Sequence, residues 1–449
     1  MAADAAAMQV DTRPFGRTGV QVPILSLGTM FDTGANQLLL RQAVKWGVAY
    51  WDTAQYYNRW GSEHGIGKYL GKYPEDRKKL FLVSKSGKRD AQGLTAELED
   101  SLNNLKTDYL DLFFIHAVDD AASELTPEIK AWAEKMKSTG RIRLFGFSTH
   151  SNMAECLSHA ATLGWIDGIM TTYNYKVMTT DDMKRAVDAC HKAGIGLTAM
   201  KTQASSSWTY MGQESDESQA LGKRFLDKGM TEEQARLLAV WTDERIAAIC
   251  SQMNTMTILK ANTEAAVNQA RLTASDRRYF EAEAQATAAN YCAGCTATCQ
   301  PLLAAAVPVG KVMRCLMYAR SYGDHFRAQV EFRDIPASVR TRLATLDYSA
   351  AERHCPQNMP ISRLMAEATR ATARRMPSTQ VSKTPSPRMA SLTAAAGRAW
   401  GRSGSPSTCA RSCLDTRWCA PAASTSWTRS PRPPGAAPAS CPSPGSTSR

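Results

Sequence analysis

Short apolar runs alternate with amphipathic stretches along the chain before about residue 275. Apolar runs of about four to eight residues between turn residues are typical of buried strands. The stretch 91–106 differs, because its leucines recur at spacings of four, four and three, which predicts a helix with one apolar face. Strands are expected over eight runs: 22–28, 49–53, 80–85, 110–116, 144–148, 166–172, 196–200 and 256–259.

The order of these elements predicts the fold class. Helical patterns separate successive strands, and one of them begins at Thr126-Pro127, an N-cap followed by proline, and ends near Gly140. Alternating strands and helices predict a parallel sheet, and eight repeats predict an α/β fold closed into a (β/α)8 TIM barrel. A long polar insertion, 202–230, lies between the last two strands, where loops of such barrels form the active face.

The end of the chain has a different composition. Residues 371–449 hold 11 of the 20 prolines, and their 11 Lys+Arg against one acid supply most of the net charge of +12. This mixture buries too little apolar surface to offset its ordering entropy, so disorder is expected. A reading-frame artefact of GC-rich DNA and a basic arm that contacts acidic surfaces are the two alternatives. The expected domains are a barrel over 1–275, a mainly helical cysteine-containing extension over 276–370, and this tail.

The charge of the remaining chain is nearly balanced, with 43 Lys+Arg and 41 Asp+Glu in residues 1–370. The total charge therefore gives no reason to expect nucleic-acid binding. No apolar run is long enough to span a bilayer, and the first residues lack the apolar segment of a secretory signal. We expect a cytoplasmic protein without membrane or nucleic-acid partners, whose 12 cysteines are thiols or metal ligands. Its oligomeric state stays open.

Four polar residues lie at or just after the ends of successive predicted strands. Asp52 ends the second strand, and Tyr57 follows in the next loop. Lys85 ends the third strand and His116 the fourth. Each residue alone is commonly a cap or an ion-pair partner. Because the carboxyl ends of barrel strands converge at one mouth, all four are expected to meet in space.

Together these four residue types suit the reduction of a carbonyl by hydride transfer, which needs a proton donor for the developing alkoxide. Tyrosine is a poor acid in water, with a pKa of about 10. A nearby ammonium would lower that pKa, and a carboxylate would hold the lysine in place. A neutral histidine would donate a hydrogen bond to the carbonyl oxygen and orient it.

Further motifs accompany these four residues. They are Phe15-Gly16-Arg17-Thr18-Gly19, Asp52-Thr53-Ala54 with Tyr57, Lys85, Tyr109-Leu110-Asp111-Leu112 with His116, and Gly146-Phe147-Ser148. With these motifs the sequence resembles the aldo-keto reductase family over about residues 13–275. The resemblance implies a barrel that binds NADP(H) or NAD(H) at its C-terminal face and reduces a small-molecule carbonyl. It implies that Tyr57 is the acid/base, that Asp52 and Lys85 tune it, and that His116 orients the carbonyl.

Several cofactor contacts implied by the resemblance carry unusual residues. Thr149 follows Ser148 where many members have Ser-Asn. Met200 stands near the position at which a tyrosine of other members usually stacks on the nicotinamide ring. Lys260 would pair with a 2′-phosphate, which favours NADP. The implied cofactor set is Ser148, Thr149, Asn174, Met200 and Lys260. These departures keep open an alternative, a non-catalytic barrel that binds nucleotide as a sensor or regulatory subunit.

Cysteines beyond the barrel have a ligand-like spacing. Cys292, Cys295 and Cys299 form C-x2-C-x3-C, and Cys355 follows in a Cys-Pro pair. Such thiolates can enclose one metal or cluster, and a late Cys-Pro ligand is typical of iron–sulfur sites. The pattern resembles a branch of the aldo-keto reductases with a ferredoxin-like [4Fe-4S] segment. A cluster there would exchange electrons with a reduced nicotinamide, and an electron-transfer partner is a further hypothesis. Structural zinc, free thiols and Cys315 as fourth ligand are the alternatives.

Overall fold

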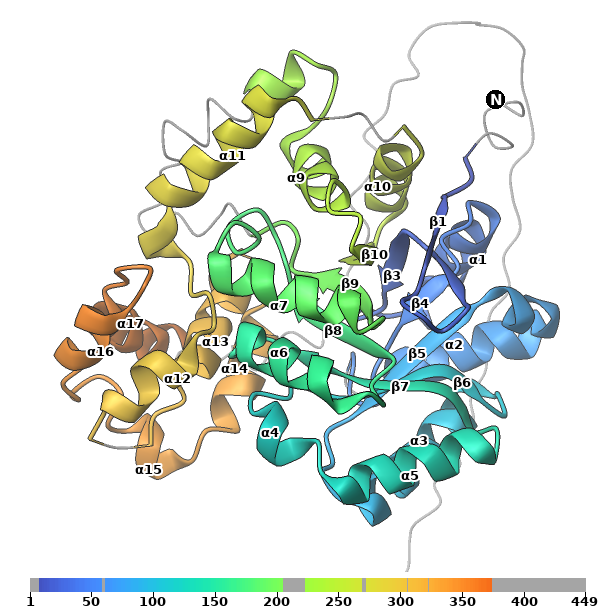
Figure 1. The fold of residues 1–449 in the computed structure, drawn as a ribbon, viewed down its shortest axis with the longest axis horizontal. Coiled ribbons are helices and arrows are strands. Elements are labelled where there is room, and N and C mark those ends of the chain that lie inside the picture. The colour runs from blue at the N-terminus through green and yellow to red at the C-terminus, as the bar shows by residue number, and fades with distance from the viewer. Residues whose placement is uncertain are drawn as a thin grey trace, which may run out of the picture. The chain divides into compact units, whose positions relative to one another are not determined.

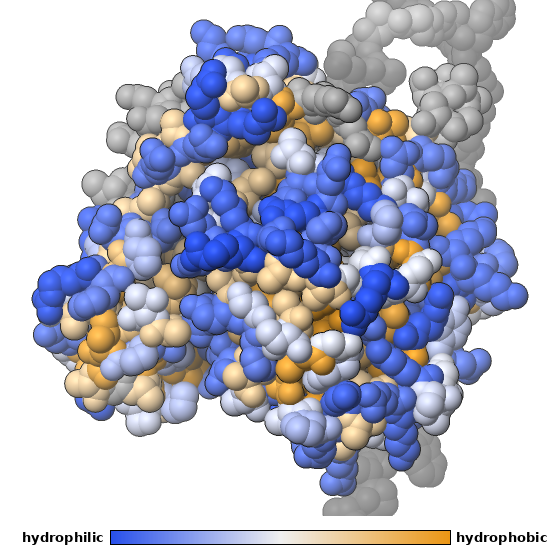
Figure 2. All heavy atoms as spheres, in the orientation of Figure 1, coloured by the Kyte–Doolittle hydropathy of each residue, from blue (hydrophilic) through white to orange (hydrophobic). Residues whose placement is uncertain are grey.

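The computed structural model describes residues 8–58, 61–204, 223–268, 272–304, 306–321 and 323–373. The chain divides into two units, Met1–Pro377 and Ser378–Arg449, and every described residue belongs to the first. The predicted disordered tail lies outside the described residues from position 374 on, and so does the central part of the predicted insertion, 205–222. Among the described residues, no helix has the length and apolar character needed to cross a membrane. Figure 2 shows polar side chains over much of one face of the molecule, with apolar ones between them.

Eight parallel strands close into a barrel in the order β10-β3-β4-β5-β6-β7-β8-β9 (Figure 1). The predicted (β/α)8 fold is therefore confirmed. A short antiparallel pair, β1 (Thr12–Pro14) and β2 (Gln21–Pro23), precedes the barrel. The barrel strands are β3 (Leu25–Gly28), β4 (Tyr50–Asp52), β5 (Phe81–Ser86), β6 (Leu110–Ile115), β7 (Ile142–Thr149), β8 (Gly168–Thr172), β9 (Gly196–Met200) and β10 (Ile246–Gln252).

A helix follows each barrel strand, and local signals fix its ends. The predicted helix near residue 91 begins where the Asp90 side chain accepts a hydrogen bond from the Gly93 amide, and it buries its leucine face. Thr126 caps the helix that Pro127 begins, as its sequence predicts. These helices are α1 (Gln37–Lys45), α2 (Gly61–Lys72), α3 (Ala91–Leu105), α5 (Pro127–Ser138), α6 (Met153–Leu163), α7 (Asp181–Lys192), α9 (Glu232–Trp241) and α10 (Met256–Asn268), with the short η1 (Pro74–Lys79) and α4 (Ala121–Glu124) in loops.

The position of the eighth strand was predicted incorrectly. The run 256–259 is not a strand but the first turn of α10, and the eighth strand is β10. Ile246 and Ile249 of β10 are fully buried, whereas Met256 is 45% and Ile258 39% exposed. A run of four apolar residues is too short for its period to distinguish a strand from a helix.

Described residues after the barrel form a mainly helical extension, drawn in gold to red in Figure 1. It has an apolar core of its own, with Val312, Leu316 and Leu364 buried together. Asn152, after β7, anchors the beginning of the extension, because its Oδ1 accepts hydrogen bonds from the Ala297 amide and the Thr296 hydroxyl. The helices are α11 (Ala274–Ala286), η2 (Ala288–Asn290), α12 (Thr296–Cys299), η3 (Gln300–Leu302), α13 (Val309–Ser321), α14 (His325–Arg333), α15 (Ala337–Arg340), α16 (Ser349–His354) and α17 (Ile361–Ala373).

Candidate active site

Lys85 connects two of the other residues singled out in the sequence. Its ammonium donates hydrogen bonds to Oδ1 of Asp52 at 2.6 Å and to the Thr53 carbonyl at 2.9 Å. It also lies 3.4 Å from the hydroxyl of Tyr57. Lys85 is on β5 and Asp52 ends the neighbouring strand β4, so the parallel register brings the two side chains together inside the barrel. Both are almost completely buried.

A turn after β4 returns Tyr57 to this position. The amide of Tyr57 donates to the Ala54 carbonyl at 3.0 Å, and the carbonyl of Tyr57 accepts from the Ser62 amide at 3.2 Å. The Lys85 ammonium lies 4.8 Å from the centre of the Tyr57 ring. The short loop between β4 and α2 therefore holds the phenol against the ammonium.

His116 follows β6, and its backbone is held on both sides. Its amide donates to the Ser86 carbonyl at 2.8 Å, and its carbonyl accepts from Arg89 at 2.9 Å. The His116 ring lies edge-on to Tyr57, with centroids 5.9 Å apart. Its Nδ1 is hydrogen-bonded to the hydroxyl of Tyr56, and these two rings are stacked. Tyr56 was not among the predicted site residues, although the Tyr56-Tyr57 pair is visible in the sequence.

Burial dominates the electrostatics of the site. It raises the pKa of Tyr57 well above its ordinary value; the Asp52 charge adds to the rise and the Arg327 charge opposes it. The lowered pKa expected from the sequence is therefore not found, and the phenol stays protonated near neutral pH, as a proton donor must. Burial also lowers the pKa of His116 well below its ordinary value, with a further contribution from Lys85. The imidazole is neutral and can donate one hydrogen bond.

The extension adds two side chains that the sequence analysis did not identify. Tyr318 on α13 is buried, with the Lys201 ammonium 5.0 Å and the Arg327 guanidinium 4.7 Å from the centre of its ring. Arg327, on α14, also pairs with Glu331 at 2.9 Å. No motif or period marks these residues, because they belong to helices that pack against the barrel only in the folded chain.

The predicted cofactor residues are divided between the strand ends and a helix. Ser148, Thr149 and Met200 lie at the carboxyl ends of β7 and β9, on the face that carries Tyr57. The Thr149 hydroxyl donates to the Ser151 carbonyl at 2.8 Å. Lys260 lies on α10, and its ammonium pairs with Glu264 one turn later on that helix.

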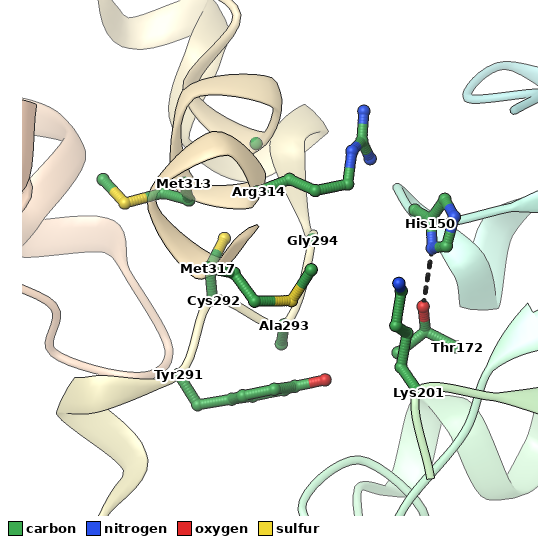
Figure 3. Close-up of a pocket in the computed structure, with 11 residues that line it drawn as sticks. His150, Thr172, Lys201, Tyr291, Cys292, Ala293, Gly294, Met313, Arg314 and Met317 are labelled. Carbon is green, nitrogen blue, oxygen red and sulfur yellow. Dashed lines mark hydrogen bonds between the residues drawn. The ribbon is translucent and has the colours of Figure 1, made fainter. Parts of the chain in front are cut away.

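Asn174 contacts the extension. Its side-chain amide donates to the Tyr291 hydroxyl at 2.9 Å and to the Lys201 carbonyl at 3.1 Å. The same region contains a pocket between strand ends and extension, which we call the mouth pocket (Figure 3). It is lined by His150, Thr172, Lys201, Tyr291, Cys292, Ala293, Gly294, Gly310, Met313, Arg314 and Met317.

The four predicted cysteine ligands line a second pocket. Cys292, Cys295, Cys299 and Cys355 share it with apolar side chains from α13 and the residues around α17. Cys315 is fully buried in α13 and does not line this pocket. In the described part of the chain, no three His, Cys, Asp or Glu side chains form a group that could hold a single metal ion.

The comparison with known proteins assigns the chain to a family. Residues 25–262, slightly more than half of the chain, match the aldo/keto reductase family model. The chain therefore belongs to the aldo/keto reductase family.

Two curated relatives are oxidoreductases. The uncharacterized oxidoreductase YrpG of Bacillus subtilis is 26% identical over 212 residues, which cover 41% of this chain and 64% of that relative. The methylglyoxal reductase YeaE of Escherichia coli is 39% identical over 137 residues, 29% of this chain and 46% of the relative. In these two alignments the chain spans about half to two thirds of the relative's length.

Solved structures support the same fold. The aldo-keto reductase AKR11C1 of Bacillus halodurans superposes with a TM-score of 0.53 at 20% identity, covering 64% of this chain and 98% of that one. The thermostable aldo-keto reductase Tm1743, solved with the inhibitor epalrestat, has a TM-score of 0.50 at 25% identity, covering 60% and 98%. The described extension, with Tyr318 and Arg327, lies beyond the residues that the family model matches.

Proposed function

We propose that this chain reduces the carbonyl group of a small molecule with NADPH or NADH, and that Tyr57 donates the proton. The observation that carries the proposal is the position of Lys85, whose ammonium lies between the Asp52 carboxylate and the Tyr57 hydroxyl at 2.6 Å and 3.4 Å. The family match and the oxidoreductases among its relatives support the same chemistry.

Each of these side chains has a defined task in that reaction. A bound nicotinamide cofactor would supply the hydride, held beside Ser148, Thr149 and Met200. Tyr57 donates its phenolic proton to the carbonyl oxygen, and the Lys85 ammonium stabilises the phenolate that remains. Asp52 holds Lys85 in place through the hydrogen bond between them. Neutral His116 donates a hydrogen bond that orients the carbonyl and stabilises the developing negative charge.

Removal of one hydroxyl tests this proposal. Purified wild-type and Tyr57→Phe proteins are mixed with NADPH or NADH and a panel of aldehydes, ketones and quinones, and cofactor oxidation is followed by absorbance. We expect Tyr57→Phe to lose at least about 100-fold in kcat with cofactor binding retained. Tyr73→Phe, outside the site, is the matched control and should behave as wild type. Equal turnover by wild type and Tyr57→Phe would refute the role of Tyr57.

One observation favours a second function, that of a non-catalytic nucleotide-binding regulatory barrel. The Asn174 amide, expected at the cofactor, is engaged by Tyr291 of the extension. In that case the wild type would bind NADPH, measured by the change in its fluorescence, but would oxidise it with no member of the carbonyl panel.

We further propose that the cysteine pocket holds an iron–sulfur cluster that exchanges electrons with a partner. Four thiols around one pocket match the ligand number of a [4Fe-4S] cluster. The pocket favours Cys355 over Cys315 as fourth ligand.

Iron and acid-labile sulfide analysis of anaerobically purified protein tests the cluster. We expect about four irons per chain in the wild type and in Cys315→Ser. Cys355→Ser and Cys295→Ser should lose iron and the brown absorbance. A colourless wild type without iron would refute the proposal, and loss of iron in Cys315→Ser but not in Cys355→Ser would assign the fourth ligand to Cys315.

A further inference from the structure

The mouth pocket brings two cationic side chains together from different parts of the chain. Lys201 follows β9 of the barrel, and Arg314 lies on α13 of the extension. Figure 3 shows Arg314 reaching across the pocket toward His150, while Lys201 extends from the barrel side into the same space. Arg314 lies outside residues 25–262, so the family match does not assign it a role.

Arg314 differs from the other basic residues of its helix. Lys311 pairs with Asp334, and Arg320 pairs with Glu367. Arg314 forms no ion pair or hydrogen bond with any residue that the structure describes. Its guanidinium therefore brings a permanent positive charge and five hydrogen-bond donors to the pocket. None of these donors has an acceptor among the described residues.

The pocket lining lacks negative charge and is partly apolar. None of the described residues that line it is an aspartate or a glutamate. Met313, Met317 and Ala293 form part of the wall. Glu331, which acts electrostatically on the nearby Tyr318, is itself paired with Arg327. Because apolar walls reduce screening, the attraction between these cations and a bound anion is stronger than in water.

The pocket lies at the carboxyl ends of the barrel strands, the face that also carries the proposed reaction centre, because Thr172 ends β8 and Lys201 directly follows β9. The charge of Arg314 is among the causes, after burial, Lys85 and Arg327, that lower the pKa of His116. Arg314 and Lys201 both contribute to lowering the pKa of His150, which lines the pocket and is hydrogen-bonded to Thr172 at 3.0 Å. An anionic group held by Arg314 therefore lies within electrostatic range of the histidine that would orient a carbonyl.

We propose that the mouth pocket binds the acidic group of the carbonyl substrate, a carboxylate or a phosphate, through Arg314 and Lys201. This inference rests on the proposed reduction of a carbonyl and narrows its substrates to short anionic aldehydes or ketones. A planar guanidinium donates two parallel hydrogen bonds to a carboxylate or phosphate, so it fixes the direction of the substrate as well as its charge.

Matched substrates with and without the acid test the site. The first pair is 4-oxobutanoate and its uncharged methyl ester, and the second is glyceraldehyde 3-phosphate and glyceraldehyde. We expect wild type to prefer the acidic member of at least one pair by about 10- to 100-fold in kcat/KM. Arg314→Gln should abolish that preference, mainly through a higher KM for the acidic member.

Two controls separate this site from a general effect. Lys311→Gln removes a charge from the same helix outside the pocket lining and should retain the wild-type preference. The Kd of NADPH, measured by fluorescence, should be the same for wild type and Arg314→Gln. A weaker Kd with unchanged substrate preference would show that Arg314 binds the phosphates of the cofactor and would overturn the proposal. An equal loss of kcat/KM on acidic and uncharged substrates in Arg314→Gln would also overturn the proposal.

Calorimetric titration keeps the site testable if no carbonyl is reduced. Succinate and inorganic phosphate are unreactive probes of the same charge type. Binding of either to the wild type but not to Arg314→Gln would support the anion site while the proposed reductase function failed. Binding of neither probe, in a protein that reduces the uncharged aldehydes, would refute the anion site and leave the reductase function intact.

Discussion

The Nδ1 atom of His116 is hydrogen-bonded to the hydroxyl of Tyr56, and the two rings stack with their centroids 5.0 Å apart. Because His116 is neutral, a hydroxyl that donates to Nδ1 leaves the ring proton on Nε2, where it can be donated to a carbonyl oxygen. Tyr56 would then be a positioning residue that selects the useful tautomer of His116.

We predict that Tyr56→Phe lowers kcat for carbonyl reduction by about fivefold, since one neutral hydrogen bond contributes about 1 kcal/mol. The KM for the carbonyl should change little. The kcat of wild type and variant is measured under saturating cofactor, with Tyr73→Phe as control. Because a structural defect would also lower the unfolding midpoint, thermal melting is recorded in parallel. An unchanged kcat would show that Tyr56 does not act through His116.

The buried pair of Lys85 and Asp52 leads to a prediction about stability. Removing one partner leaves the other as an isolated buried charge, which costs about 3–5 kcal/mol. Lys85→Met and Asp52→Asn should therefore each lower the free energy of unfolding by about that amount, measured by urea denaturation. Both variants should also lose carbonyl reduction.

The double variant Asp52→Asn/Lys85→Met distinguishes pairing from packing. It contains no buried charge at this position, so its free energy of unfolding should be well above the value expected from adding the two single losses. Its activity should stay as low as that of Lys85→Met. Strict additivity of the two stability losses would contradict the pairing argument.

The sequence predicted the parts of the site that depend on strand ends. Asp52 ends β4 and Lys85 lies one residue before the end of β5, and a closed parallel sheet brings residues at such strand ends to one mouth of the barrel. Tyr57 could be predicted as a neighbour of Asp52 because it follows Asp52 by only five positions in the chain. The cysteine positions were likewise visible as a spacing, and all four line one pocket.

The contribution of the extension could not be predicted in the same way. Tyr318, Arg314 and Arg327 lie on helices whose apolar periodicity shows which side is buried but not which strand ends they face. The barrel residues on which they act, Lys201 and His116, are more than 100 residues away in the chain. The prediction of a strand at 256–259 was wrong for a different reason, because four apolar residues fit the first turn of a helix equally well.

Two buried histidines predict a loss of stability in acid. Burial lowers the pKa values of His116 and His150 well below 6.5 in the folded protein, whereas in the unfolded chain they stay near 6.5. The unfolded state therefore binds more protons below pH 6.5, and the stability present above that pH is lost as the pH falls. The slope of the free energy of unfolding against pH should approach about 1.4 kcal/mol per pH unit for each histidine.

The free energy of unfolding at pH 7.5 and pH 5.5 tests this relation. His150→Gln should lose less stability between the two pH values than wild type, by up to about 1.4 kcal/mol. His64→Gln, which changes an exposed histidine, serves as control and should keep the wild-type difference. Identical pH dependence of wild type and His150→Gln would contradict the prediction.

A substitution at Gly294 tests the contact between the segment that contains Cys292 and Cys295 and the barrel. It has a φ of +79°, and a Cβ atom there would lie 2.4 Å from the His150 carbonyl oxygen. Gly323 has a φ of +63° but no atom within 4 Å of such a Cβ. Alanine pays about 1–2 kcal/mol for positive φ at either position, and only Gly294→Ala adds a clash with backbone. Gly294→Ala should therefore lower the free energy of unfolding by about 1–3 kcal/mol more than Gly323→Ala. Urea denaturation of both variants measures this difference, and equal losses would show that the segment moves away from His150 without cost.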